Sequence, residues 1–135
     1  MKVTGFDGKE RTLKVKARKS KNASSLHVRA RNILQKLFPF DRFYEEVTLP
    51  GSSTLSNCTL YADFLSIKKK LCIETHGIQH YEYSSRFHEN KSDLVAGQNR
   101  DKTKREWCEL NGFTLVELPY NEDDQQWIKR IKSAN

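Results

Sequence analysis

The chain of 135 residues lacks any long apolar run, and hydrophobic residues make up 36% of it. No segment approaches the roughly 20 consecutive apolar residues that a membrane-spanning helix needs. The N-terminus also lacks the apolar stretch of a secretory signal peptide. These absences lead us to expect a cytoplasmic protein with no membrane partner, whose length suits one hydrophobic core.

Cysteines are few and scattered. Cys58, Cys72 and Cys108 lie far apart, and no CxxC pair occurs. An odd, dispersed set argues against a disulfide framework and for reduced thiols. The sequence therefore predicts no structural zinc held by a cysteine knuckle.

Positive charge is concentrated at one end of the chain. The net charge is +7, and residues 1–22 carry eight Lys or Arg against two acids, which leaves +1 for the remaining residues. A basic segment on a near-neutral body is typical of a nucleic-acid binder, although a solubilising tail would have the same composition.

Local patterns predict nine elements. Asp7-Gly8 favours a hairpin over residues 2–16, followed by a basic linker. Further strands are expected over 43–49, 60–67, 71–75 and 114–118. Helices are expected over about 24–37, from Asn90 or Ser92 to about 110, and over 122–132. The long second helix makes a crossover, so we expect an α/β fold with a mixed sheet flanked by helices. Residues 1–22 form a basic N-terminal hairpin and arm in this division, and residues 23–135 form the main domain.

Three polar residues interrupt the central pair of strands. Asp63 lies inside the first apolar run, and Glu74 and His76 lie in the second. Side chains alternate along a strand, so Glu74 and His76 share one face. A buried Asp is costly without a partner, which favours function over a simple edge position. If the turn at Lys68–Lys70 brings Asp63 beside Glu74, the patch predicts a site for a hard divalent metal with a base next to it.

The order of these residues resembles a known nuclease family. Ile73–Gly77 reads IETHG, Gln79-His80 follows, and Arg100-Asp101 lies in a helix that ends at Asn111-Gly112. This pattern resembles the very-short-patch-repair endonuclease branch of the PD-(D/E)xK superfamily, which includes homing endonucleases with an E…D…x-H…D motif. The resemblance extends from about Ser24 to Leu118 and implies a restriction-endonuclease-like core.

The resemblance implies specific roles for the central residues. Asp63 would be the metal-bridging aspartate and Glu74 the second acidic ligand, with a further oxygen from the Thr75 carbonyl. His76, in the place of the superfamily's lysine, would be the general base. A neutral imidazole with an ordinary pKa of about 6.5 suits that role near neutral pH.

A second pair would support the first. By the same resemblance, His80 and Asp101 lie close together, with Asp101 orienting a histidine or assisting the leaving group. The alternative for Asp101 is an ion pair with Arg105, four residues along the helix.

The sequence departs from the branch at two points. The position of the usual glutamate of the first helix is occupied by His27. Either His27 takes that role, or Glu45 or Glu46 reaches in from the next strand, or the site functions without such a residue. The cysteines that hold zinc in the repair enzymes are also absent near Gly77-Ile78, which again predicts no structural zinc.

These features together predict an endonuclease that hydrolyses DNA with Mg²⁺, for which Mn²⁺ can substitute. By family analogy, phage or mobile-element biology in a bacterial cell is expected. Two alternatives stay open. One is a junction resolvase, which would act as a homodimer on four-way junctions, and the other is a non-catalytic DNA-binding module with a decayed site.

Overall fold

The core of the protein is a four-stranded mixed sheet. The computed structural model describes residues 1–16, 19–21, 23–52, 60–78 and 91–135, with residues 91–98 described by their backbone. The strand order is β3-β4-β5-β6, with the first three antiparallel in turn and β6 parallel to β5. Their bounds are β3 Tyr44–Thr48, β4 Tyr61–Ser66, β5 Leu71–His76 and β6 Thr114–Pro119. The predicted α/β fold with a mixed sheet is confirmed.

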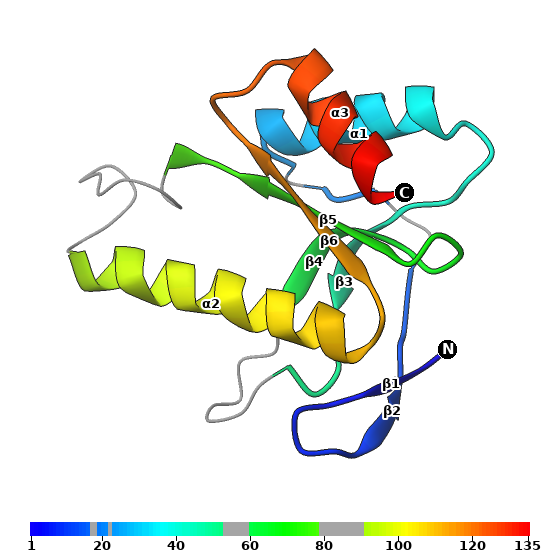
Figure 1. Ribbon diagram of the computed structural model, residues 1–135, viewed down its shortest axis with the longest axis vertical. Helices are drawn as coiled ribbons and strands as arrows, with labels where there is room; N and C mark the ends of the chain where they lie inside the picture. The colour runs from blue at the N-terminus through cyan, green and yellow to red at the C-terminus, as the bar shows by residue number, and fades with distance from the viewer. Residues whose placement is uncertain (17–18, 22, 53–59, 79–90) are drawn as a thin grey trace.

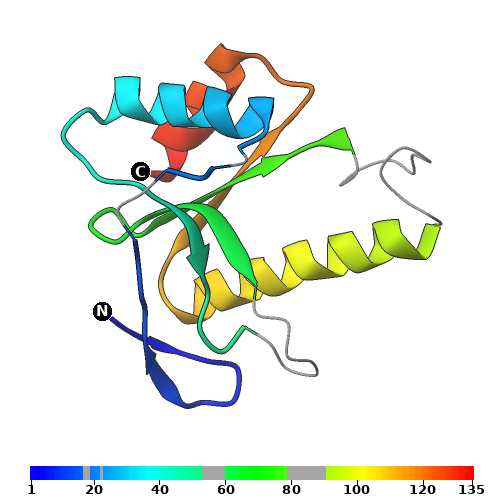
Figure 2. The same ribbon diagram turned by 180° about the vertical axis from the view of Figure 1, so that it is seen from behind.

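Helices cover both faces of this sheet (Figures 1 and 2). Helices α1 (Ser25–Leu37) and α3 (Asp124–Ala134) lie on one face, and α2 (Lys91–Leu110) lies on the other. Ser24 caps α1, where its hydroxyl accepts the His27 N–H at 3.2 Å. Helix α2 supplies the crossover that the parallel β5–β6 pair requires.

Each face has its own apolar cluster. Trp107 of α2 is fully buried on one side and Trp127 of α3 on the other, and their indole N–H groups donate to the carbonyls of Pro50 and Pro119 at 2.9 and 2.8 Å. Both large side chains are therefore buried without leaving an unpaired donor. Both faces of the sheet are therefore packed against helices, which holds the strands in fixed positions.

The N-terminal hairpin is part of the α2-side core. Strands β1 (Lys2–Thr4) and β2 (Glu10–Thr12) form a separate two-stranded sheet, as predicted. Val3 and Leu13 are buried in the cluster around Trp107. The Asn111 side chain accepts the Thr4 N–H at 2.6 Å and donates to the Thr4 carbonyl at 3.0 Å. The basic hairpin is thus a packed element, and its lysines are exposed on the outside.

No helix within the described ranges is long and apolar enough to span a membrane.

Truncating the hairpin's buried leucine tests whether the hairpin stabilises the whole domain. We expect Leu13→Ala to lower the free energy of unfolding by about 2–4 kcal/mol, because it leaves a cavity in the core. Leu110→Ala removes the same atoms from a side chain that is 50% exposed, and should cost under about 1 kcal/mol. Urea denaturation measures both, and equal costs would show that the hairpin is not part of the cooperative unit.

Candidate active site

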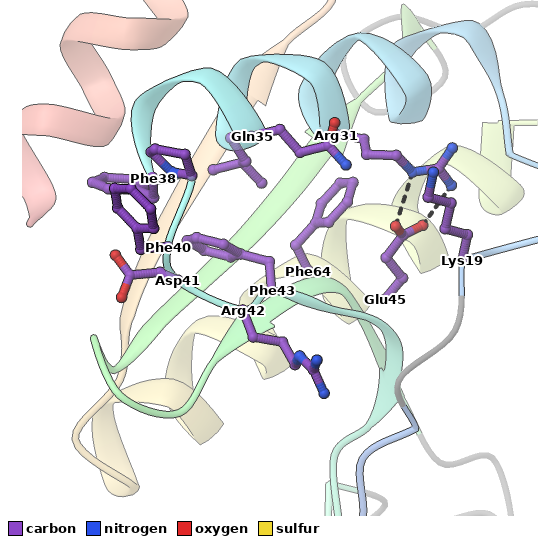
Figure 3. Close-up of a pocket in the computed structure, with 12 residues that line it drawn as sticks. Lys19, Arg31, Gln35, Phe38, Phe40, Asp41, Arg42, Phe43, Glu45 and Phe64 are labelled. Carbon is purple, nitrogen blue, oxygen red and sulfur yellow. Dashed lines mark hydrogen bonds and ion pairs between the residues drawn. The ribbon is translucent and has the colours of Figure 1, made fainter.

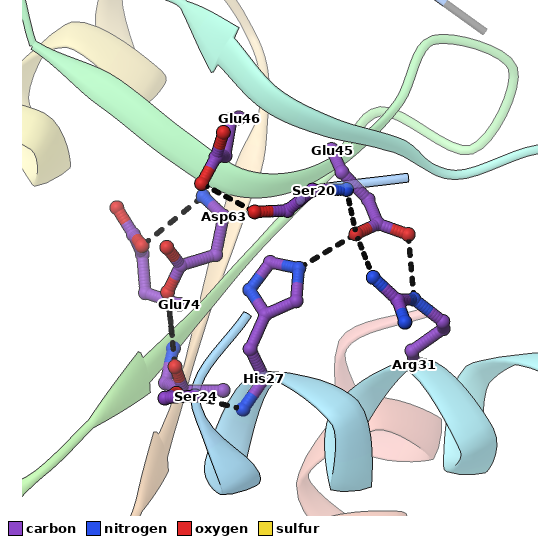
Figure 4. Close-up of polar contacts among 9 residues, drawn as sticks. Ser20, Ser24, His27, Arg31, Glu45, Glu46, Asp63 and Glu74 are labelled. Carbon is purple, nitrogen blue, oxygen red and sulfur yellow. Dashed lines mark hydrogen bonds and ion pairs between the residues drawn. The ribbon is translucent and has the colours of Figure 1, made fainter. Parts of the chain in front are cut away.

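The β4–β5 ladder opens at Asp63. Backbone pairing runs from Ser66–Leu71 to Phe64–Ile73. Beyond it, the Thr75 N–H donates to Asp63 Oδ2 at 2.9 Å, and the Thr75 hydroxyl donates to the same oxygen at 3.1 Å. In return, the Asp63 N–H donates to Glu74 Oε2 at 3.3 Å (Figure 4). Side-chain bonds have replaced backbone bonds here, so the two carboxylates meet in the gap between the strands.

The neighbouring strand is irregular at the same level. Glu46 of β3 has a positive φ of 50°, and it lies opposite Asp63, between the paired positions Glu45–Phe64 and Val47–Ala62. A positive φ is uncommon for a residue with a side chain and marks local strain. The irregularity therefore crosses two strands and is centred on Asp63.

The Glu74 carboxyl is buried beside another acid. Its residue is 3% exposed. Burial and the Asp63 carboxylate raise the pKa of Glu74 well above its ordinary value, against the opposing effect of Lys104. The Lys104 ammonium lies 2.7 Å from Glu74 Oε1. Burial would lower the pKa of Lys104, but the carboxylates of Glu74, Asp63 and Asp101 outweigh it and raise it. The gap therefore holds two carboxyl groups close together, and these stabilise the charged form of Lys104.

His76 is held between two further carboxylates. Its Nδ1 lies 3.3 Å from Glu117 Oε2, and its Nε2 lies 4.0 Å from Asp101 Oδ1. His76 and Asp101 are both buried. Arg105, the alternative partner of Asp101, donates to Glu117 Oε1 at 2.7 Å. Glu74 and His76 both contact groups of α2, which confirms that they share a face.

On the α1 side, His27 and Glu45 form one network. His27 Nε2 lies 2.7 Å from Glu45 Oε1, and Arg31 binds both oxygens of Glu45 at 2.7 and 2.8 Å. The His27 ring stacks on Phe64, next to Asp63 in the chain, with centroids 4.3 Å apart. Two of the three candidates for the missing first-helix glutamate, His27 and Glu45, are thus in direct contact with each other.

Glu45 and Glu46 also hold the arm. The Ser20 N–H donates to Glu45 Oε1 at 3.1 Å, and its hydroxyl donates to Glu46 Oε1 at 2.6 Å. Burial would raise the pKa of Glu45, but the hydrogen bonds from Arg31, Ser20 and His27 outweigh it and hold that pKa at about 2. Glu45 is therefore ionised throughout the neutral and mildly acidic range.

Sequence reasoning missed two residues of the site, Lys104 and Glu117. Lys104 lies three residues after Asp101, so helical spacing alone places both on one face. Glu117 pairs in register with Glu74 across the parallel strands, and its position inside the apolar run TLVELP was the available signal. His80, a predicted partner of Asp101, lies outside the described residues.

The oxygens that face the gap suit a hard cation. Among the described residues, no three His, Cys, Asp or Glu side chains form a ready metal cluster. Mg²⁺, however, usually takes one or two carboxylates and keeps several waters. The N–H and C=O of one strand residue point to the same side, so the Thr75 carbonyl faces the gap with its N–H. If such an ion binds here, Asp63, Glu74 and the Thr75 carbonyl are the groups that would hold it.

Comparison with known proteins finds relatives among viral proteins. Uncharacterized protein 307L of Invertebrate iridescent virus 6 is 43% identical over 68 residues, which are 50% of this chain and 34% of that protein. Uncharacterized protein 094L of Frog virus 3 is 42% identical over 74 residues, which are 53% of this chain and 48% of that protein. Uncharacterized protein 033L of Invertebrate iridescent virus 3 is 44% identical over 50 residues, 37% and 26% of the two chains.

The chain thus spans less than half the length of each of these relatives. No protein-family model and no solved structure matches it.

Replacing the lysine of the gap tests its role as a counter-ion. We expect Lys104→Met to lower the free energy of unfolding at neutral pH by roughly 2–4 kcal/mol, because it leaves the buried Glu74 and the half-buried Asp63 without their cation. Lys102→Met changes an exposed residue of the same helix and should cost under about 0.5 kcal/mol. Chemical denaturation compares the two variants, and equal stabilities would mean that Lys104 does not balance the pair.

The Glu45 network predicts a specific acid response. Because its pKa is lowered, Glu45 contributes stability that is present above about pH 4.5 and is lost as the pH falls toward about 2. We expect Glu45→Gln to lose roughly 1–2 kcal/mol at pH 7, after allowance for solvent screening. The deficit should shrink through that acid window. Unfolding curves at several pH values check this, with the exposed Glu106→Gln as control; a deficit that stays constant would contradict it.

Proposed function

We propose that the chain is a metal-dependent endonuclease that hydrolyses phosphodiester bonds of DNA on a restriction-endonuclease-like core. The observation that carries the proposal is the opened ladder. It places the carboxylates of Asp63 and Glu74, from adjacent strands, in one gap. The buried His76 lies two residues after Glu74 and has carboxylate neighbours of its own. The sequence pattern IETHG with a downstream Arg-Asp supports the same conclusion.

Asp63, Glu74 and the Thr75 carbonyl would hold Mg²⁺. When bound, the ion would supply charge stabilisation at the phosphoryl oxygens, which phosphodiester hydrolysis requires. Glu74 must be ionised for this role, and Lys104 favours its ionised form by contact at 2.7 Å. The lysine therefore offsets part of the effect of burial and of the Asp63 carboxylate, which raise the pKa of Glu74.

His76 is the residue suited to take a proton from the attacking water. The Glu117 carboxylate faces Nδ1, so a proton placed there leaves the Nε2 lone pair to act as base. Asp101, 4.0 Å from Nε2, stabilises the imidazolium that then forms. Water adds to phosphorus, the bond to the leaving oxygen breaks, and that oxygen takes up a proton.

A second candidate function is a non-catalytic DNA-binding module. The observation in its favour is the same Lys104 contact, because an ammonium that balances Glu74 can stabilise the gap without any metal. A junction resolvase acting as a homodimer is a variant of the nuclease proposal and differs in its preferred DNA.

Plasmid cleavage separates these candidates. With Mg²⁺, we expect the protein to nick or linearise supercoiled plasmid, and EDTA should stop it, with Mn²⁺ able to replace Mg²⁺. Asp63→Asn should abolish cleavage, and His76→Gln should slow it by about 10²–10⁴-fold, the usual contribution of a general base. Glu109→Gln, an exposed carboxylate of α2, is the matched control and should cut normally.

The outcomes are distinct. Wild-type protein that binds DNA but never cuts it would support the binding module. Cleavage that survives both Asp63→Asn and His76→Gln would overturn the residue assignment. A marked preference for four-way junctions over linear duplex would identify the resolvase.

A further inference from the structure

A continuous groove follows the outer edge of β3. One cavity of about 950 Å³ lies between the arm and β3, and a second of about 660 Å³ lies between α1, the loop after it and β3. Lys19 and Glu45 line both cavities, so the two adjoin. We call the combined feature the β3 groove, and Figure 3 shows its aromatic half.

The arm half of the groove carries unbalanced positive charge. Lys14, Lys16 and Lys19 line it, and in the described part of the chain none of them has an acidic partner. Of the two acids that line it, Glu45 is ion-paired with Arg31, whereas Glu46 accepts a hydrogen bond from the neutral Ser20 hydroxyl and keeps its negative charge. Three lysines against one carboxylate leave the groove with a net positive charge, which suits a polyanion.

The other half presents aromatic side chains. Phe40 is 97% exposed, and Phe38 and Phe43 stack beside it with centroids 5.8 Å apart (Figure 3). Arg42 lines the same cavity. An exposed ring next to cations is an arrangement on which unpaired bases stack, whereas bases inside a duplex are already stacked and cannot use it.

The groove passes close to the candidate active site. Glu46 lines it and lies opposite Asp63, on the adjacent strand. Adjacent strands are about 4.8 Å apart. A chain bound along the outer edge of β3 would therefore lie about two strand spacings, roughly 10 Å, from Asp63 on β4.

We infer that the β3 groove binds an unpaired nucleic-acid strand, with Lys14, Lys16 and Lys19 on the phosphates and Phe40 under a base. The inference rests on the proposed function and narrows its substrate to DNA with a single-stranded segment beside the cut, such as a flap or a branch. A peptide strand added to the edge of β3 fits less well. The positive φ of Glu46 breaks the regular edge, and Ser20 is bonded to the side chains there.

Binding without metal tests the groove independently of cleavage. Fluorescence anisotropy in EDTA, with labelled oligodeoxythymidine and a blunt duplex, measures affinity across a salt series. We expect tighter binding of the single strand. Replacing Lys14, Lys16 and Lys19 together by Ala should weaken it and reduce the slope of log K against log salt by about 2, since each phosphate contact on a single strand contributes roughly 0.7.

A matched triple variant controls for net charge. Lys36, Lys129 and Lys132 are exposed on α1 and α3, and none of them lines either cavity of the groove. Their replacement by Ala removes the same charge and should leave the slope nearly unchanged. Phe40→Ala should weaken single-strand binding roughly tenfold, and Phe40→Tyr should restore it because the ring remains.

The groove proposal would be overturned if the two triple variants weakened single-strand binding equally, or if Phe40→Ala left the affinity unchanged. Tighter binding of blunt duplex than of single strand would also overturn it. The proposal and the nuclease can fail separately. If the protein binds single strands through the groove but never cuts DNA, the groove proposal stands and the nuclease proposal fails. If the protein cuts flapped and blunt DNA equally, with or without the three lysines, the nuclease proposal stands and the groove proposal fails.

Discussion

The opening of the β4–β5 ladder at Asp63 is the constraint on which the rest of the site depends. A strand pair that stops early leaves backbone N–H groups without partners, and each such group is costly when buried. Here the Asp63 carboxylate accepts from Thr75, and Glu74 accepts from Asp63. The same bonds that complete the sheet therefore force two acids together. The hydrogen bonds that satisfy the backbone thus also determine where the two carboxylates lie. The Lys104 ammonium, in contact with Glu74, reduces the repulsion between them.

The two helix layers supply opposite electrostatic environments to this sheet. On the α1 side, Arg31 binds both oxygens of Glu45, and the pKa of that carboxyl falls. On the α2 side, Glu74 is more deeply buried and shares its lysine with a neighbouring acid, so its pKa rises. The pKa values of two glutamates therefore shift in opposite directions because their neighbours and their burial differ. Glu45 stays ionised down to a pH of about 2 and holds the arm and His27, whereas burial favours the protonated form of Glu74.

Local sequence patterns were sufficient for the elements and for the central pair, but not for contacts between elements. The turn between the two central strands fixes their register, so the approach of Asp63 to Glu74 followed from the chain between them. Lys104 did not, because it is one of several charges in KTKRE and its burial depends on how α2 lies across the sheet. Glu117 was missed for a similar reason: its partnership with His76 arises only when β6 pairs with β5. The place of His80 stays a prediction.

The hydrogen bonds between Thr4 and Asn111 have a consequence for how the protein is made. They join residues 107 positions apart, so the hairpin is synthesised well before its partner at the end of α2. Until α2 has been synthesised, Val3 and Leu13 have no Trp107 to pack against. During that interval the nascent hairpin exposes its apolar side chains without their native partners. Its lysines are well suited to keep that exposed intermediate from self-association.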